Sequence, residues 1–364
     1  MIKTIFPSKD ATLYEHTASM NTGLDPILEI RKDISGSGGD LFRSRALVQF
    51  DTTEISASLA AQGINTGSDS GSLKYFLKMF VSEETDVAAS YNLHLSHLLL
   101  DWDMGTGKFT SDPIVTDGCS WTNRKPDVAW GQSGGLFLGY GTNTPSHVSQ
   151  SFTNVTGDIE MDVTRIVEDL FYNNDAYSNH GFIIMRSGSE ETNSTEFGSL
   201  AYYSRETNTI YPPRLEVRYK DVTNSFDVAV TGSEVTVNDI IKVRPRLQPE
   251  YRRGDVTRIF VDIDKQYNGR SQVGTTGVVS RNYLPQSSSF AIKDVATNEY
   301  VFNHDEKYTQ IGRTGNTLNY FDLDTNGLFP ERHYCVEFKV NYYSGTNVVA
   351  TKHYKPNLYF RIAR

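Results

Sequence analysis

The chain has 364 residues and a formal net charge of −9, and Tyr and Phe dominate its aromatic residues. Polyanions are held chiefly by dense Lys and Arg, so this charge argues against a general phosphate-binding surface and against nucleic acid as a specific partner. The amino-terminal residues lack the apolar core of a secretory signal, and no stretch is apolar for long enough to span a bilayer. We therefore expect neither Sec-type export nor a membrane partner.

The first 220 residues alternate short apolar segments with turns, a pattern typical of β-strands. The expected strands cover residues 11–14, 27–30, 45–51, 73–81, 91–100, 181–186, 200–204 and 214–219. One or two helical turns are expected at 55–61, and apolar residues at helical spacing after Asp162 predict a helix over 163–172. Many short strands with little helix predict a jelly-roll β-sandwich over residues 1–220.

A new series of strands begins close to residue 221 and continues to residue 364. Its expected strands cover residues 226–230, 235–237, 240–247, 256–263, 290–293, 318–321, 334–342 and 358–362. This size and pattern predict one immunoglobulin-like β-sandwich over residues 221–364. The segment from Leu328 through Pro330 to Tyr334 resembles the Leu-x-Pro-x-x-x-Tyr motif of fibronectin type III domains, so Tyr334 is expected to form a tyrosine corner.

Two segments resemble ligand-binding loops only in part. Residues 322–327 place Asp322, Asp324, Asn326 and Gly327 as a calcium loop does, but the twelfth position is His333 where a Glu is required. An acidic turn is the favoured interpretation, with calcium binding as the alternative. Residues 105–108 lack the first Gly and the final Ser or Thr of a phosphate loop, so a plain turn is expected.

Candidate catalytic side chains do not form a recognisable set. His94 and His97 are expected on opposite faces of a strand, with His94 and Ser96 facing solvent and His97 partly buried. The carboxylate pairs lie beside turns, where solvation is expected to keep both members ionised: Asp101 with Asp103, Glu83 with Glu84, and Glu190 with Glu191. We therefore predict a non-enzymatic protein without catalytic, cofactor-binding or metal-binding residues.

Three further residue sets allow two interpretations each. Cys119 and Cys335 fall in different predicted domains and are expected to be reduced, inert thiols. The tryptophans are expected in the core, with a sugar-stacking platform as the alternative: Trp102, Trp121 and Trp130. A basic cluster is expected to form an ion-paired surface, with docking of an acidic partner as the alternative: Lys242, Arg244, Arg246, Arg252, Arg253 and Arg258.

Several sequence pieces, in a fixed order over residues 8 to about 219, resemble the DNRLRE family of β-sandwich domains. The matching pieces are Asp10-Ala-Thr-Leu-Tyr14, Arg45-Ala-Leu-Val-Gln-Phe-Asp51, Trp102-x-x-Gly-x-Gly107, Asp117-Gly-x-Ser-Trp121-x-Asn-Arg124, Asp162-Val-Thr164, Gly181-Phe182, Ser204-Arg-Glu206 and Pro213-x-Leu-x-Val217. That family is similar to carbohydrate-binding modules, so the resemblance implies a jelly-roll fold and a possible glycan ligand.

Residues 222–364 resemble a domain of virion proteins of tailed marine phages. The matching pieces are Tyr251-Arg-Arg-Gly-Asp255, Asn282-Tyr-Leu-Pro285, Leu328-x-Pro-Glu-Arg-x-Tyr334 and Tyr359-Phe-Arg-Ile362. The resemblance implies a structural protein of the neck, tail or baseplate, which is assembled in the host cytoplasm and packs against copies of itself and other virion proteins. The alternative is a carbohydrate-binding module for attachment to a glycan or host surface.

Overall fold

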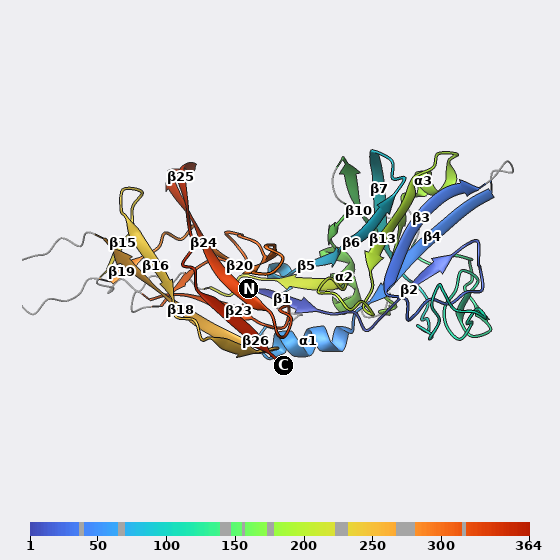
Figure 1. The fold of residues 1–364 in the computed structure, drawn as a ribbon, viewed down its shortest axis with the longest axis horizontal. Coiled ribbons are helices and arrows are strands. Elements are labelled where there is room, and N and C mark those ends of the chain that lie inside the picture. Colours follow the sequence, from blue (N-terminus) through green and yellow to red (C-terminus); the bar gives the residue numbers. More distant parts are fainter. Residues whose placement is uncertain are drawn as a thin grey trace, which may run out of the picture. The chain divides into compact units, whose positions relative to one another are not determined.

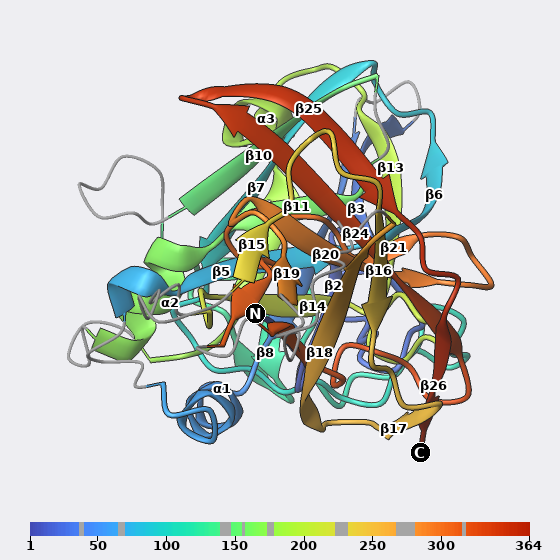
Figure 2. The same ribbon diagram turned by 90° about the vertical axis from the view of Figure 1, so that its left-hand side faces the viewer.

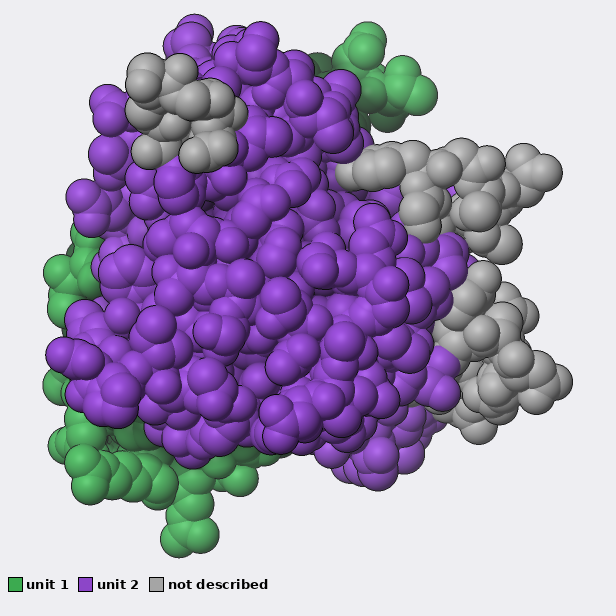
Figure 3. Space-filling view, turned by 90° about the vertical axis from the view of Figure 1, so that its right-hand side faces the viewer, with its two compact units in different colours: residues 1–4, 218–364 green, residues 5–217 purple. Residues whose placement is uncertain are grey.

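A computed structural model describes the chain except for residues 36–39, 65–69, 139–146, 155–156, 173–177, 223–231, 267–280 and 315–317. Strands dominate the described residues and helices are few and short, so the predicted all-β class is confirmed (Figure 1). The chain divides into two compact units. Unit 1 contains Met1–Thr4 and Arg218–Arg364, and unit 2 contains Ile5–Val217 (Figure 3).

The larger sheet of unit 2 has eight strands, in the order β10-β7-β12-β4-β3-β13-β6, and β2 pairs with β4. The strands are β2 (Lys9–Tyr14), β3 (Ile27–Ser35), β4 (Asp40–Gln49), β6 (Val81–Thr85), β7 (Ser90–His97), β10 (His147–Thr153), β12 (Phe182–Arg186) and β13 (Gly198–Tyr203). All the described pairings in this sheet are antiparallel. Alternate residues of a strand point to opposite faces, and the consecutive buried residues of β2, β12 and the middle of β4 show that both faces of the sheet are covered there.

A second sheet of unit 2 has the order β1-β14-β5-β11. Its strands are β1 (Ile2–Ile5), β5 (Lys74–Met79), β11 (Ile159–Asp162) and β14 (Arg214–Arg218), and the limit between the units falls within β1 and β14. In β5, which lies within the strand predicted over 73–81, the residues Tyr75, Leu77 and Met79 are buried and alternate with half-buried ones. This alternation fixes the register of the strand because a shift by one residue would expose all three.

Short elements connect the strands of unit 2. They are α1 (Thr52–Ala60), the 3-10 turn η1 (Ser70–Ser72), β8 (Asn123–Lys125), β9 (Val128–Ala129), α2 (Thr164–Tyr172) and α3 (Gly188–Thr192). The predicted helix is confirmed as α2. The Asp162 carboxylate accepts a hydrogen bond from the amide of Thr164, and Ile166 and Val167 are buried. An acceptor at this point satisfies a backbone donor that the first helical turn leaves free.

Unit 1 has two main sheets, in the orders β16-β18-β23-β22 and β17-β26-β24-β20-β21, with β25 paired to β24 (Figure 2). Their strands are β16 (Ile241–Pro245), β17 (Glu250–Arg252), β18 (Val256–Lys265), β20 (Ser288–Asp294), β21 (Tyr300–Phe302), β22 (Gly312–Arg313), β23 (Asn319–Asp324), β24 (His333–Ser344), β25 (Asn347–Tyr354) and β26 (Tyr359–Ala363). A further two-stranded sheet pairs β15 (Gly232–Glu234) with β19 (Arg281–Tyr283).

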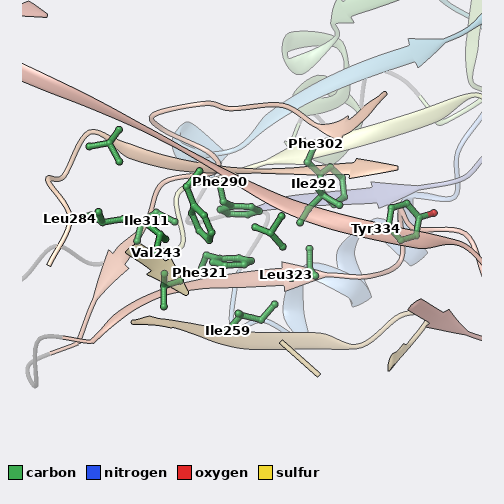
Figure 4. Close-up of a cluster of buried hydrophobic side chains, with 14 of the residues drawn as sticks. Val243, Ile259, Leu284, Phe290, Ile292, Phe302, Ile311, Phe321, Leu323 and Tyr334 are labelled. Carbon is green, nitrogen blue, oxygen red and sulfur yellow. The ribbon is translucent and has the colours of Figure 1, made fainter. Parts of the chain in front are cut away.

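Side chains from both main sheets of unit 1 form one buried cluster (Figure 4). Phe290 of one sheet stacks on Phe321 of the other, with their ring centroids 4.2 Å apart. Phe338, which is the register partner of Phe290, also meets Phe321 edge-on at 6.1 Å. Ring burial of this size supplies much of the stability of a small β-domain, so this stack is the centre of the unit 1 core.

One local and one long-range polar contact stabilise unit 1. The hydroxyl of Tyr334 accepts a hydrogen bond from the amide of Phe329 at 2.8 Å, five residues earlier, so the predicted tyrosine corner is confirmed. The Lys3 ammonium contacts the buried Asp324 carboxylate at 2.8 Å, and the exposed fractions of the two side chains are 9% and 0%. A buried ion pair compensates both charges, which explains why residues 1–4 belong to the same unit as residue 324.

Several elements differ from those expected. The strand predicted at 235–237 is wrong, because β15 ends at Glu234 and a turn follows, in which the Asp239 carboxylate accepts from the amide of Thr236. The predicted strand at 226–230 lies outside the described residues. The sequence did not predict β10, α3 or the long strand β25. β10 and β25 are largely exposed, so the alternation that marks a half-buried strand is weak in both.

Candidate functional site

The three tryptophans lie in the interior of unit 2. The exposed fractions of Trp102, Trp121 and Trp130 are 0%, 5% and 1%. The indole N–H of Trp102 donates to the His180 carbonyl, and that of Trp130 donates to the Ser120 carbonyl, each at 2.8 Å. A sugar ring can stack only on an accessible aromatic face. The predicted core role of these residues is therefore confirmed, and the alternative of a tryptophan platform for sugars is wrong.

The Glu190–Glu191 pair is buried, so the prediction of a solvated pair is wrong. Glu191 and Arg45 form a bidentate ion pair in which the exposed fractions of the side chains are 7% and 8%. The third guanidinium nitrogen of Arg45 donates to the Gly134 carbonyl at 2.7 Å. Two parallel hydrogen bonds and a carbonyl acceptor satisfy the buried guanidinium, which is the condition under which such a charge is tolerated.

Helix α3 explains why both glutamates point inwards. Its N-cap is Ser187, whose hydroxyl accepts from the amide of Glu190. The carboxylate of Glu190 then accepts from the backbone and side-chain nitrogens of Asn92 in β7. Each carboxylate is thus held by a partner far away in the sequence, and the pair supplies neither a free acid nor a free base.

The other two carboxylate pairs lie at the surface, as predicted. Asp101 and Asp103 are about half exposed, and Asp101 forms ion pairs with Lys9 and Lys125. Although partial burial opposes it, the hydrogen bonds and charges of these two lysines lower the pKa of Asp101 to about 2. Such a carboxylate stays ionised at neutral pH and is unsuited to act as a general acid.

The calcium-like segment is a strand end stabilised by ion pairs. Asp322 lies in β23 and makes a bidentate ion pair with Arg258, and Asp324 pairs with Lys3. The second carboxylate oxygen of Asp324 accepts from the amide of Asn326, which forms a tight turn. Among the residues that the structure describes, no group of three or more His, Cys, Asp or Glu side chains could hold a metal ion.

Residues 105–108 form a turn packed on Asn21. The Asn21 side chain accepts from the amide of Gly107 and donates to the carbonyls of Met104 and Cys119. Gly105 has a φ of +75°, and a Cβ there would lie 2.3 Å from the Asn21 oxygen. The glycines therefore serve close packing of this loop, in agreement with the predicted turn.

The histidines are spread over both units, and in unit 1 the Nδ1 of His304 lies 3.5 Å from the Ser289 hydroxyl. His94 and His147 stack at 5.6 Å on the outward side of β7 and β10. His97 is buried, and burial lowers its pKa to about 4 despite a hydrogen bond to the Ser178 carbonyl. The opposite orientation predicted for His94 and His97 agrees with this burial, whereas Ser96 is 1% exposed and does not face solvent as expected.

Much of the basic cluster is neutralised within unit 1. The guanidinium groups of Arg244, Arg246 and Arg258 form ion pairs with carboxylates of β18 and β23. Arg252 lies in β17, which belongs to the other main sheet. The cluster is therefore divided between two sheets, and its paired members form the ion-paired surface that the sequence favours. The alternative docking face for an acidic partner loses half of its cations to these ion pairs.

Both cysteines are free, and they lie in different units. Cys119 belongs to the buried cluster around the tryptophans. Burial raises the pKa of the Cys119 and Cys335 thiols, so neither has the thiolate character of a reactive cysteine.

Asp10 joins two of the sequence motifs in unit 2. Its buried carboxylate accepts from the amide of Arg205 at 2.7 Å, so β2 is tied to the segment that follows β13. Burial, only partly offset by this hydrogen bond and the Arg205 charge, raises the pKa of Asp10 to about 7. A perturbed carboxyl can mark a functional site, but this one is enclosed and 1% exposed, so its role is structural.

Asp10→Asn is expected to stabilise unit 2 at pH 8 and to do so much less at pH 5. A folded-state pKa of about 7 lies above the ordinary 3.8, so the stability that protonated Asp10 contributes is fully present below pH 4 and is lost as the pH rises through 7. The increase in the free energy of unfolding that the variant brings should be larger at pH 8 than at pH 5 by on the order of 2 kcal/mol. Denaturant unfolding of both proteins at the two pH values measures this, and a constant difference would contradict the raised pKa.

Unit 2 carries a polar groove of about 730 Å³. Its lining comes from the segment after β2 and from the ends of β3, β4, β6 and β13: His16, Arg31, Asp33, Ile34, Phe42, Asp86, Glu196 and Gly198. None of these residues was singled out from the sequence. The available signal was the alternation in β3, where half-buried Glu29, Arg31 and Asp33 flank the fully buried Ile30 and Lys32.

Unit 1 carries exposed apolar side chains near the turn that joins β24 to β25. Tyr343, Val348 and Val349 are 45%, 49% and 58% exposed, and Val237 and Ile240 of the turn before β16 are 36% and 59% exposed. The Lys352 ammonium donates to the Val237 carbonyl, which holds the two segments together. We call these five residues the apolar patch. A groove of about 690 Å³ adjoins it, lined in part by Val237, Tyr343 and Val349.

Comparison with known proteins does not identify a family for the chain. Neither models of known protein families nor curated protein sequences match the chain. Of the helices that the structure describes, none is long and apolar enough to cross a membrane.

Proposed function

We propose that the chain is a non-enzymatic structural protein of a tailed-phage virion, in the neck, tail or baseplate. It would consist of a jelly-roll β-sandwich over residues 1–220 and an immunoglobulin-like β-sandwich over residues 221–364. Assembly would take place in the host cytoplasm, and its partners would be copies of itself and other virion proteins. Support comes from the two sequence resemblances and from candidate catalytic groups that are engaged in structural contacts.

The apolar patch is the observation that carries this proposal. Clustered exposed apolar side chains mark surfaces that pack against other proteins. β25 pairs only with β24 among the described strands, so its second edge is available for hydrogen bonding to another strand. Rigid β-domains with such surfaces suit the repeated subunit contacts of a symmetric particle.

Mass spectrometry of purified particles of the encoding phage tests the virion role, and particles that lack the chain would refute it. The packing role predicts that the purified chain self-associates and that Val348→Asp with Val349→Asp weakens association at least about tenfold. Analytical ultracentrifugation measures this. Val295→Asp is the control because Val295 is also exposed, at 45%, but lies in the turn after β20. Equal weakening by both changes would show that the patch is not the contact.

The second candidate function is glycan attachment. The buried tryptophans cannot provide it, but the groove of unit 2 combines accessible rings with polar side chains. This feature supports the carbohydrate-binding alternative. The contacts would be made by residues of the groove and not by the tryptophans that the sequence suggested.

A further inference from the structure

A row of polar side chains crosses the outward face of the unit 1 sheet that contains β20, β24 and β25. In β24, Phe338 and Val340 belong to the core cluster, so Lys339 between them projects to the other face. Ser289 of β20 and His353 of β25 are each directly opposite Lys339. Residues that are opposite each other in antiparallel strands project to the same side. Ser289, Lys339 and His353 therefore form one row across three strands.

Residues 303–311, which join β21 to β22, lie over this row, and we call them the strap. The Nδ1 of His304 is 3.5 Å from the Ser289 hydroxyl at one end of the row. The ring centroid of His304 is 5.7 Å from that of His353 at the other end. His304 therefore lies above the middle strand, which carries Lys339. Ser289 is only 1% exposed, in agreement with a cover on this side of the sheet.

The strap also contacts the apolar patch. The carboxylate of Glu306 accepts hydrogen bonds from the side-chain amide of Asn341 and from the hydroxyl of Tyr343, the latter at 3.1 Å. Tyr343 is a member of the patch. At its end the strap is bound to β20, because the amide of Phe290 donates to the Thr309 carbonyl at 2.9 Å. The position of Tyr343 in the patch therefore depends on the strap.

The surroundings of His304 favour a neutral ring. Its Nε2 is buried and has no hydrogen-bond partner among the described residues, so a proton there would bury an N–H without an acceptor. Burial, with the charges of His353 and Lys339, lowers the pKa of His304 to about 4, although the charge of Glu337 opposes this. Protonation of His304 is thus costly as long as the strap stays in place.

Neighbouring charges do not compensate a proton on this ring. The charged and titratable groups on and beside the row are Lys293 of β20, Tyr300 of β21, Glu337 and Lys339 of β24, His353 of β25, Lys355, and Asp305 and Glu306 of the strap. One oxygen of Glu337 accepts from the Tyr300 hydroxyl at 2.8 Å, and the other pairs with Lys355 at 3.1 Å. The Asp305 carboxylate accepts from backbone amides within the strap. Protons on His304 and His353 would therefore add to the lysine charges of this face.

We propose that acid releases the strap from the sheet and thereby frees Tyr343 of the apolar patch. Protonated His304 and His353 would repel each other and Lys339, and the strap is the element that can move away. The release concerns unit 1 by itself. Its consequence for packing rests on the proposed function, in which the apolar patch is a contact surface.

The attached strap is expected to be most stable at neutral and higher pH. A pKa of about 4 in the attached state, below the ordinary 6.5, means that the released state takes up the proton first. The attached state keeps its full stability above pH 6.5 and loses it as the pH falls towards 4. The full shift corresponds to about thirtyfold more release at pH 5 than at pH 7.5. Because the ring is only half-buried and solvent screens its charge, we expect at least about fivefold.

Hydrogen exchange of the full chain at pH 7.5 and pH 5, corrected for the intrinsic rate at each pH, tests the release. Peptides that cover the strap should lose protection at least about fivefold at pH 5, whereas β18 and β23 should not. His353→Lys places a permanent charge in the row and should loosen the strap already at pH 7.5. His304→Gln should remove most of the pH dependence. His333→Lys, at another exposed position of β24, is the matched control and should leave the strap unchanged.

Each outcome decides the proposal. Loss of protection confined to the strap, reproduced at pH 7.5 by His353→Lys and not by His333→Lys, supports it. Equal protection at both pH values, an equal loss in β18 and β23, or the same loosening by both lysine variants overturns it. Circular dichroism verifies that each variant is folded. If His304→Gln is unstable, the substitution of the exposed His353 still decides the question.

Analytical ultracentrifugation of the wild type and His353→Lys at pH 7.5 separates the release from the proposed function. A loosened strap with weaker self-association supports both. A loosened strap with unchanged self-association supports the release and shows that the patch is not the contact. A strap that stays protected in His353→Lys overturns the release, whatever the association.

Discussion

Replacing Glu191 with alanine is expected to lower the free energy of unfolding of unit 2 by about 3–5 kcal/mol. The substitution leaves the Arg45 guanidinium, with its side chain 8% exposed, without the carboxylate that accepts two of its hydrogen bonds. An uncompensated buried charge costs much more than the loss of an exposed ion pair. Denaturant unfolding followed by the fluorescence of the nearby Trp121, which stacks at 5.0 Å from the guanidinium, measures the loss.

Glu83→Ala is the matched control, because Glu83 is an exposed carboxylate of the edge strand β6 and should change stability by no more than about 0.5 kcal/mol. Replacing both partners, as Arg45→Met with Glu191→Leu, should restore much of the loss, since the desolvation cost of both charges disappears. A loss below about 1 kcal/mol for Glu191→Ala would mean that water reaches the pair.

Local patterns predicted those parts of the fold that local physics determines. The mostly apolar segment 73–81 identified β5, in which every second side chain, those of Tyr75, Leu77 and Met79, lies in the core. Tyr334 was identified as a corner through its Leu-x-Pro-x-x-x-Tyr spacing, and its hydroxyl bonds a backbone group only five residues away. In both cases the partner or the periodicity lies within a few residues.

The errors arose where the partner is distant in the sequence. Glu190 and Glu191 follow a Gly-Ser turn and look solvated, but Asn92 and Arg45 are 98 and 146 residues away from them. Only the paired strands bring these groups together. The exposed strand β25 was missed for another reason, because a strand outside the core needs no apolar alternation.

The groove of unit 2 could not have been assembled from sequence for the same reason. His16 and Phe42 belong to segments paired through β2 and β4, whereas Asp86 and Glu196 reach the groove through the contact of β6 with β13. The register of four strands decides which side chains share the outward face. Without that register, Arg31 and Lys32 are equivalent cations, although one lines the groove and the other is fully buried.

In unit 1, Phe321→Ala is expected to lower the free energy of unfolding by about 3–5 kcal/mol. The Phe321 ring is fully buried against Phe290 and Phe338 of the other sheet, so its removal leaves a cavity at the contact between the two main sheets (Figure 4). Phe321→Leu keeps most of the volume and should cost about 1–2 kcal/mol. A chain of two units need not unfold in one step, so the loss is best measured by hydrogen exchange of amides in β18 and β23.

Tyr359→Ala provides the control in the same unit, because the Tyr359 side chain is 53% exposed and its removal opens no cavity. Faster exchange in β18 and β23 for Phe321→Ala, together with unchanged exchange for Tyr359→Ala, would show that the ring stack stabilises the packing of the two sheets. If Phe321→Ala and Phe321→Leu cost the same, the neighbouring rings must move to fill the space. The stability would then depend on the total apolar area buried between the sheets rather than on the stack itself.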